Sequence, residues 1–234
     1  MNTPNNSLKD KIVLVTGAFS GIGRATTELL MKQRAKVVAV GRNDDNEIPS
    51  YAGNYLPIER IITDEHDAFE IVEFTLDKHK RIDIVINLAG SVIIKPVHEM
   101  TAKEYQRLMQ DNYFSAVNVT RAALPIMLKQ KQGTMVYTPC TTEKLKMTGV
   151  AGFRASAFAL QAFAHELTRE LKDSTIQVKK VEFEPVDSSF WQRYSEMIDT
   201  SRFNSCMDAA ESIIGELQSE SSASATPQGE PVRV

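Results

Sequence analysis

Short runs of apolar, mostly β-branched residues alternate along this chain with longer segments whose apolar residues recur at helical spacing. The short runs predict strands at residues 11–15, 36–40, 58–62, 82–86, 134–138 and 176–183. The segments between them predict helices ending near residue 34 and at 65–79, 101–129 and 150–172, and a last helix follows at 207–217. Continuous apolar strands that alternate with helices are typical of a parallel sheet covered on both faces. The pattern therefore predicts a three-layer, doubly wound α/β fold with a mostly parallel sheet.

The first predicted strand leads directly into a glycine-rich turn. Residues 13–24 read VLVTGAFSGIGR, which is strand, then glycines at 17, 21 and 23, then the start of a helix. This order presents backbone N–H groups and the positive end of a helix dipole to a pyrophosphate. Gly17 allows a sharp turn, while Gly21 and Gly23 keep side chains away from the phosphates and the neighbouring strand. The turn predicts a dinucleotide site; a tight turn that binds nothing is the simpler alternative.

The run TGAFSGIG at residues 16–23 resembles the T-G-x-x-x-G-x-G fingerprint of the short-chain dehydrogenases/reductases. The resemblance extends from about residue 8 to about residue 217, in the order of elements found in that family. It implies a Rossmann fold, here with a short C-terminal end. It also implies a dinucleotide held by Gly17, Ser20, Gly21, Ile22, Gly23, Asn87, Ala89, Gly90, Val186 and Ser188.

The end of the second predicted strand bears on the identity of the cofactor. In dinucleotide folds an acidic residue there bonds the adenosine ribose, whereas an arginine receives a 2′-phosphate. Gly41 and Arg42 occupy this place, which favours NADP(H) over NAD(H); a solvated loop arginine is the alternative. The resemblance also implies an aspartate near position 61 that holds adenine, and Ile61 stands there instead. We therefore expect NADP(H) to bind more weakly than in typical relatives.

The positions that carry the proton relay in the family are altered in this chain. Hydride transfer to a carbonyl needs a proton donor beside the substrate oxygen, and the family uses a tyrosine assisted by a lysine four residues later. The resemblance implies Phe153 and Ala157 at these two positions, and Cys140 at the position of the family's serine. Asn112 falls at the place of the relay asparagine. None of the 6 tyrosines is followed four residues later by lysine, so the pair has not moved elsewhere.

Glu184 is a candidate acid or base. It stands where the family has a glycine, in the run FEPVDS at residues 183–188. If its carboxyl faces the pocket, burial favours the protonated form and makes it a possible proton donor. If it faces outward, it is a solvated surface group.

Composition limits the remaining classes of function. A net charge of −3 argues against nucleic-acid binding, and 4 histidines without ligand spacing predict no metal site. No apolar stretch is long enough to span a membrane. The 2 cysteines are too few for a disulfide framework and the N-terminus lacks signal-peptide features, which together predict a cytoplasmic protein. Residues 1–8 and 219–234 read as poorly ordered polar segments around one domain at 9–218.

Three functions fit these residues. The first is a pseudo-oxidoreductase that binds NADP(H) and serves as a binding, scaffold or sensor protein. The second is an enzyme that uses the same pocket as a cyclase, isomerase or lyase, or that reduces an activated substrate such as an iminium ion. The third is an oxidoreductase with a substitute proton donor, which is disfavoured because acid–base assistance is worth about 10²–10⁴-fold in rate.

The sequence also bears on possible ligands and partners. Phe190, Trp191, Tyr194 and Met197 follow the last predicted strand, which fits either an apolar ligand or a packed helix face. The helices at 101–129 and 150–172 correspond to the helices that pair in family dimers. The resemblance therefore implies a homodimer, while the substrate or protein partner is left open.

Overall fold

The computed structural model describes residues 6–42, 53–139, 147–183, 185–192, 194–201 and 203–219. These residues form a six-stranded, fully parallel sheet with the strand order β3-β2-β1-β4-β5-β6. The strands are β1 (Ile12–Thr16), β2 (Lys36–Gly41), β3 (Tyr55–Glu59), β4 (Ile84–Asn87), β5 (Gly133–Tyr137) and β6 (Ile176–Lys180). A separate two-stranded pair joins β7 (Val186–Asp187) to β8 (Asn204–Ser205). This order confirms the doubly wound Rossmann-type fold.

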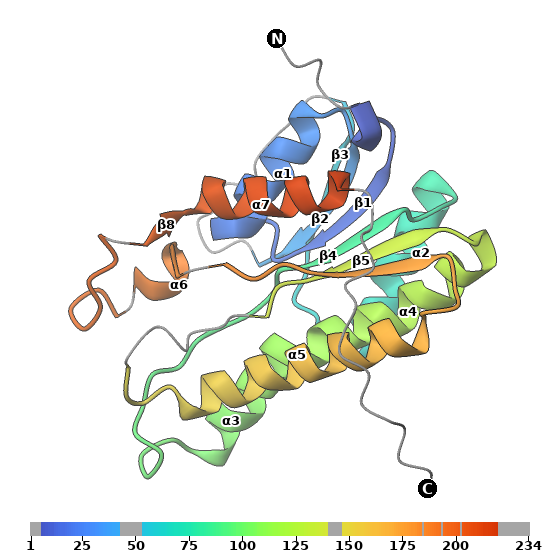
Figure 1. Ribbon diagram of the computed structural model, residues 1–234. Coiled ribbons are helices and arrows are strands. Elements are labelled where there is room, and N and C mark those ends of the chain that lie inside the picture. Colours follow the sequence, from blue (N-terminus) through green and yellow to red (C-terminus); the bar gives the residue numbers. More distant parts are fainter. Residues whose placement is uncertain are drawn as a thin grey trace, which may run out of the picture.

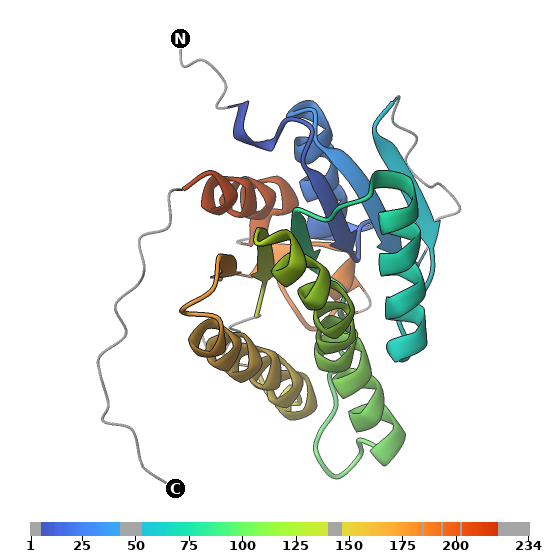
Figure 2. The same ribbon diagram turned by 90° about the vertical axis from the view of Figure 1, so that its right-hand side faces the viewer.

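Helices cover both faces of the sheet (Figures 1 and 2). One face carries α1 (Gly21–Lys32) and α7 (Cys206–Gln218), and the other carries α2 (Glu65–His79), α4 (Ser115–Gln130) and α5 (Ala151–Glu170). Because successive strand residues point to opposite faces, β1 contributes to two cores. Val13 and Val15 pack with Ile213 of α7, whereas Leu14 packs with Ile71 of α2. Among the described residues, no helix has both the length and the apolar character to cross a membrane.

The predicted helix at 101–129 is interrupted by a π-helical turn. It consists of α3 (Ala102–Met109), the π-turn η2 (Gln110–Phe114) and then α4. A capping box starts α3: the Thr101 hydroxyl accepts the N–H of Glu104, and the Glu104 carboxylate accepts the N–H of Thr101. A π-turn rotates the residues around it relative to a regular helix, and such turns are frequent at functional sites.

The third strand lies earlier than expected, at Tyr55–Glu59 and not at 58–62. The apolar run beyond residue 58 misled the prediction, because Ile61 is 49% exposed. Pro57 is tolerated because β3 is the edge strand of the sheet. The backbone groups of β3 that hydrogen-bond to β2 belong to even-numbered residues, such as the Asn54 carbonyl and the Arg60 N–H. The backbone nitrogen of Pro57 therefore points away from β2, where no N–H is needed.

The boundaries at two other places also differ from the expected ones. The sixth strand ends at Lys180, three residues before the predicted end at 183. Near the N-terminus, Asn6–Leu8 form a 3₁₀ turn, and Leu8 is buried in the core beneath α7 and α1. Ordered structure therefore begins within the segment that reads as a polar lead. The C-terminal tail at 220–234 lies outside the described residues.

A buried carboxylate joins the two central strands. One oxygen of Asp83 accepts the N–H of Ile12 at 2.8 Å, and the other accepts Nε of Arg81 at 2.9 Å. The Asp83 side chain is only 3% exposed. It therefore supplies the partner for a backbone donor at the start of β1 that water cannot reach.

We expect Asp83→Ala to lower the free energy of unfolding by about 2 kcal/mol, because it leaves a buried N–H without an acceptor. Asp83→Asn keeps one acceptor oxygen and should lose about half as much. Asp77→Ala is the matched control, since that carboxylate is 82% exposed and its loss should cost less than about 0.5 kcal/mol. Urea denaturation measures all three; equal losses for Asp83→Ala and Asp77→Ala would contradict the role assigned to Asp83.

Candidate functional site

The candidate site is the region at the carboxyl ends of β1 and β4, which we call the crevice. These strands are neighbours, but the chain leaves β1 toward β2 and leaves β4 toward β5, so the strand order reverses between them. Ligands of open α/β sheets bind at such a point. The Thr16 hydroxyl closes the floor of the crevice by accepting the N–H groups of Leu88 at 3.1 Å and Ala89 at 3.2 Å.

The glycine-rich turn packs against the β4 loop more closely than any side chain would permit. Gly17 has a φ of +68°, and a Cβ there would lie 2.7 Å from the Leu88 carbonyl oxygen. A Cβ on Gly23 would lie 2.0 Å from the carbonyl oxygen of Gly17 itself. Both residues are therefore glycine because backbone occupies the space of a side chain. The turn, which continues through Ile22 into α1, thus lies directly beside the loop after β4.

The N-terminus of α1 opens into this turn. Ser20 is its N-cap residue and is exposed, and its side chain makes no capping hydrogen bond. The first N–H groups of a helix have no partner within the helix, and here no cap side chain supplies one. Such a terminus, beside a glycine turn, is suited to bind a phosphate anion.

Three further predicted residues lie near the glycine-rich turn. Asn87 is 3% exposed; its Nδ2 donates to the Val136 carbonyl at 3.3 Å, and among the described residues its Oδ1 has no hydrogen-bond donor. Ser188 lies against the turn, because a Cβ on Gly21 would be 3.3 Å from the Cβ of Ser188. Val186 is buried in the short strand β7, which precedes Ser188. Asn87, which pairs with Thr16 in the sheet, and Ser188, which lies against Gly21, thus place small polar side chains next to the glycine-rich turn.

Arg42 follows β2 directly and is exposed at the same edge of the sheet. Its position after the second strand is the one from which an arginine meets a 2′-phosphate. Ala89 and Gly90 lie in the loop after β4. The other predicted nucleotide-binding residues lie in the turn after β1, the start of α1, the ends of β2 and β4, and the segment at 186–188.

Asn112 holds the β4 loop to α5. Its Oδ1 accepts the N–H of Ser91 at 2.6 Å, and its Nδ2 donates to the Ser91 carbonyl at 2.9 Å and to Ser156 Oγ at 2.8 Å. Ser156, which is fully buried, donates in turn to the Phe153 carbonyl at 2.7 Å. Ser156 is not among the predicted site residues, because a serine within an amphipathic helix gives no signal of its own. Through these hydrogen bonds the Asn112 side chain joins the loop after β4 to α5.

The predicted tyrosine and lysine positions face an apolar environment. Phe153 is 2% exposed, and its ring centroid lies 5.6 Å from that of Phe190 and 6.1 Å from that of Trp191. Ala157 is also buried, one turn further along α5. The Phe153 ring offers carbon atoms where a hydroxyl is needed for proton transfer. Cys140 and Glu184, the other two candidates for chemistry, lie outside the described residues.

Tyr105 and Tyr194 pack against the same cluster as Phe153, whereas two other tyrosines lie in the core on the α4 and α5 face of the sheet. The Tyr137 hydroxyl lies 2.6 Å from Thr120 Oγ1 inside the core, where burial raises the pKa of Tyr137 far above its ordinary value. Tyr113 packs against Phe163 on the same side of the sheet. The Tyr194 hydroxyl accepts the N–H of Ile94 at 3.1 Å. The same hydroxyl donates to the Val92 carbonyl at 3.5 Å, so Tyr194 bonds the backbone of the segment after β4.

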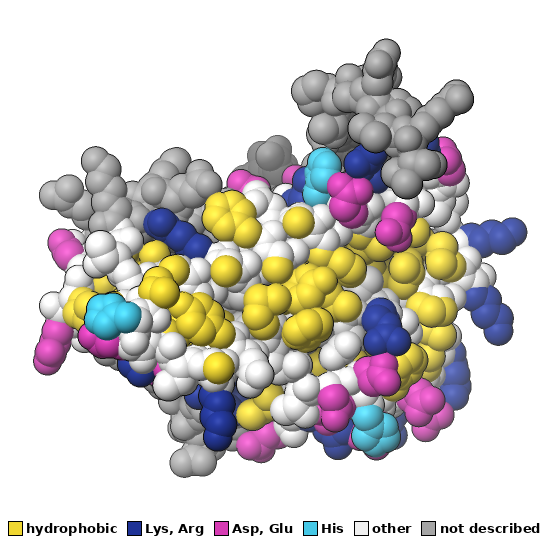
Figure 3. All heavy atoms as spheres, turned by 90° about the horizontal axis from the view of Figure 1, so that it is seen from below, with side chains coloured by type: hydrophobic (Ala, Val, Ile, Leu, Met, Phe, Trp, Pro, Cys, Tyr) yellow, Lys and Arg dark blue, Asp and Glu magenta, His cyan; other side chains and the backbone are white. Residues whose placement is uncertain are grey.

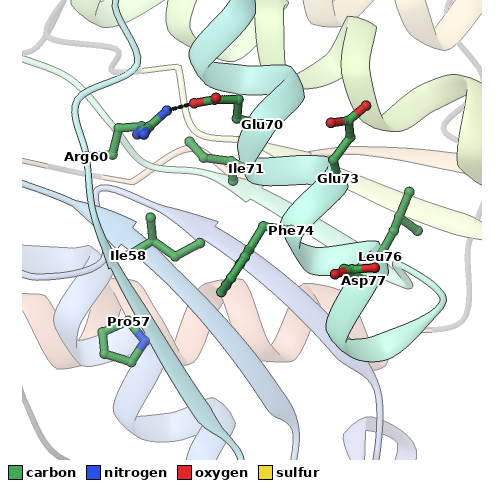
Figure 4. A pocket seen from close by; sticks show the side chains of 9 residues that line it. All are labelled: Pro57, Ile58, Arg60, Glu70, Ile71, Glu73, Phe74, Leu76 and Asp77. Carbon is green, nitrogen blue, oxygen red and sulfur yellow. Dashed lines mark hydrogen bonds and ion pairs between the residues drawn. The ribbon is translucent and has the colours of Figure 1, made fainter.

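A hollow of about 840 Å³ lies elsewhere, between the edge strand β3 and α2 (Figure 4). Its walls include Ile58 and Phe74, and Arg60 closes one end by pairing with Glu70 and with Asp67. Its basic group is thus already neutralised by acidic neighbours, and it is remote from the point where the strand order reverses. We therefore assign the carboxyl ends of β1 and β4, and not this hollow, as the candidate site. The described residues hold no cluster of three or more side chains suited to bind a metal ion.

Comparisons with known proteins bear on the family and the fold of this chain. The family model described as short chain dehydrogenase matches residues 11–199. An uncharacterized oxidoreductase of Staphylococcus aureus is 28% identical over 196 residues, which cover 80% of this chain and 83% of that protein. The structure of a short-chain dehydrogenase from Streptomyces avermitilis has a TM-score of 0.80 at 23% identity and covers 91% of this chain and 86% of its own. A tyrosine-to-phenylalanine variant of ElxO with NADPH bound has a TM-score of 0.81 at 21% identity, with 93% and 94% covered.

The close approach of Gly17 to the β4 loop predicts a large effect of a single methyl group. Gly17→Ala should lower the free energy of unfolding by more than about 2 kcal/mol, since it combines an unfavourable positive φ with overlap against backbone. Gly53→Ala is the matched control: its φ is +93°, but nothing lies within 4 Å of the added Cβ. Chemical denaturation of both variants separates backbone strain from overlap. Equal destabilisation by the two substitutions would refute the packing argument.

Proposed function

Because the chain belongs to the short chain dehydrogenase family, an oxidoreductase family, we propose that it binds NADP(H) in this crevice and has lost ordinary carbonyl–alcohol oxidoreduction. In this proposal it acts as a pseudo-oxidoreductase whose nucleotide-bound state serves binding, scaffolding or sensing. Its 2 cysteines fit the reducing cytoplasm, which we propose as its location.

Nucleotide binding is supported by a cradle that suits a pyrophosphate. Gly17 and Gly23 bring the turn into close backbone contact beside the N-terminus of α1, where no cap side chain is bonded, and the buried Asn87 Oδ1 has no donor among the described residues. NADPH supplies a hydride when it is bound. The residues of this chain would hold and orient it: backbone N–H groups at the N-terminus of α1 would bind the phosphates, and Arg42 would bind the 2′-phosphate.

Loss of ordinary oxidoreduction is supported above all by the surroundings of Phe153. Its ring is buried against Phe190 and Trp191, so the position assigned to the proton donor has carbon neighbours and no hydroxyl of its own. The structure of the ElxO variant supports the combination we propose, since that protein holds NADPH with phenylalanine in place of a tyrosine. Without a positioned acid, reduction of an unactivated ketone loses about 10²–10⁴-fold in rate.

Isothermal titration calorimetry with NADPH and NADH tests this proposal. We expect NADPH to bind, and Arg42→Ala to weaken that binding about tenfold or more while leaving NADH binding unchanged, because a charge-assisted phosphate contact is lost. Arg24→Ala is the control for loss of a positive charge, as Arg24 is an exposed residue of α1 that pairs with Glu28. Absence of heat with both NADP⁺ and NADPH would overturn nucleotide binding. NADPH-dependent reduction of simple ketones at ordinary rates would overturn the loss of oxidoreduction.

We also propose a homodimer that forms through the outer face of α4 and α5. Figure 3 shows hydrophobic side chains gathered on the face formed by the lowest helices of Figure 1. Large apolar side chains on these helices and η2 are strongly exposed: Phe114 by 44%, Leu128 by 44% and Phe158 by 45%. Such gathered apolar surface is typical of an interaction site.

Phe158→Glu should convert this dimer to a monomer, because it places a charge in the apolar contact. Sedimentation velocity at micromolar concentration measures the change in mass. Met197→Glu, at a residue that is 70% exposed outside this face, should leave the dimer intact. A wild-type protein that sediments as a monomer at all concentrations tested would rule out the dimer.

A further inference from the structure

The segment after β7 crosses the mouth of the candidate site. Ser188 lies against Gly21, as described above, and Phe190 in the short helix α6 (Ser189–Gln192) reaches the other wall. A Cβ on Gly90 would lie 4.0 Å from Cε2 of Phe190. The segment thus spans from the glycine turn after β1 to the loop after β4.

The aromatic side chains of this segment close the β4 side of the crevice. Phe153, Phe190, Trp191 and Phe203 form what we call the aromatic plug. The Phe190 and Trp191 ring centroids are 5.1 Å apart, and Trp191 lies 6.4 Å from Phe203. Trp191 is 3% exposed, and Val92, Met100 and Leu108 complete the apolar cluster around it. Packed aromatic edges and faces of this kind exclude water and hold one another in place.

The two ends of the crevice are therefore chemically unlike. A dinucleotide places its pyrophosphate at the N-terminus of α1 and its adenosine ribose at the end of β2. The other half of the molecule must then extend to the opposite side, over the β4 loop and Gly90. Phe190 covers that side. Arg42, which follows β2, and the N-terminus of α1 lie on the opposite side.

We propose that Phe190 and Trp191 determine the selectivity of the site between the two halves of the dinucleotide. The phosphorylated adenosine half binds to the structure as it stands, and the nicotinamide half enters only after the aromatic plug is displaced. Affinity for a state that is seldom populated is reduced by the fraction of molecules in that state. The site should therefore hold 2′,5′-ADP almost as tightly as NADP⁺. This inference rests on the proposed function.

Trp191 provides a direct readout, because the chain contains 1 tryptophan. An indole that moves from an apolar environment into water emits at longer wavelength. Saturating NADP⁺ should shift the emission of Trp191 to the red, whereas saturating 2′,5′-ADP should leave it unchanged. A red shift of equal size with both ligands, or no shift with NADP⁺, would overturn the displacement of the plug.

Calorimetry of Phe190→Ala tests the selectivity. Removing this ring should tighten NADP⁺ binding about tenfold while 2′,5′-ADP binding stays within about twofold, because only the nicotinamide half gains space. Phe163→Ala is the matched control: Phe163 is also a partly buried aromatic residue, but it packs with Tyr137 in the core on the α4 and α5 face. Its affinities for both ligands should equal those of the wild type.

The outcomes separate this inference from the proposed function. If neither ligand gives heat with the wild-type protein, nucleotide binding fails and the inference fails with it. If both bind and Phe190→Ala leaves the ratio of their affinities unchanged, or weakens NADP⁺ binding, only the selectivity role is rejected. Phe190→Leu keeps the cluster apolar and should change the ratio in the same direction, so it serves where circular dichroism shows that the alanine variant is unfolded.

Discussion

The contact between the turn after β1 and the loop after β4 sets the geometry of the candidate site. Thr16 Oγ1 accepts two successive N–H groups of that loop, and Gly17 brings its backbone against the Leu88 carbonyl. At this separation neither side chain nor water fits between the two segments. The phosphates of a nucleotide would consequently meet main-chain N–H groups, and the position of α1 follows from the same turn.

The two sides of the crevice differ in the chemical groups that line them. On the α1 side the groups are backbone donors and small polar side chains, which suit a charged phosphate. On the side of Phe153 the groups are aromatic carbon, which favours burial and disfavours a developing charge. A phenol and an ammonium at positions 153 and 157 would need polar partners and solvent access. Phe153 instead packs against Phe190 and Trp191 of the aromatic plug, and Ala157 is also buried.

Asn112, at the position of the family's relay asparagine, connects two segments of the site through its side chain. It is buried within the π-turn η2, and the three hydrogen bonds of its side chain join the β4 loop to α5 through Ser91 and Ser156. This tie fixes Gly90 beneath Phe190 and fixes the first turns of α5 that carry Phe153. The polar network therefore supports the apolar plug above it.

The sequence by itself determined the class of fold, and it predicted which residues form the glycine-rich turn after the first strand. Alternating apolar runs and helical periods reflect which faces must be buried, and the glycines mark places where backbone must approach backbone. The capping box at Thr101 was likewise readable, because its two hydrogen bonds are local. The register of β3 was not, since an edge strand is weakly specified by apolar pattern and Pro57 is acceptable only where no ladder bond is required.

Only the tertiary structure decided which residues meet inside the crevice. Residues 90, 153, 190 and 203 are far apart along the chain, and no periodicity links them. The sequence left open whether Phe190 and Trp191 contact a ligand or pack as a helix face, and the structure packs them against Phe153. The π-turn at Asn112 was equally hidden, because one extra residue in a turn barely alters an apolar pattern. Local patterns record what each segment buries, whereas the chemistry of a site depends on contacts between segments.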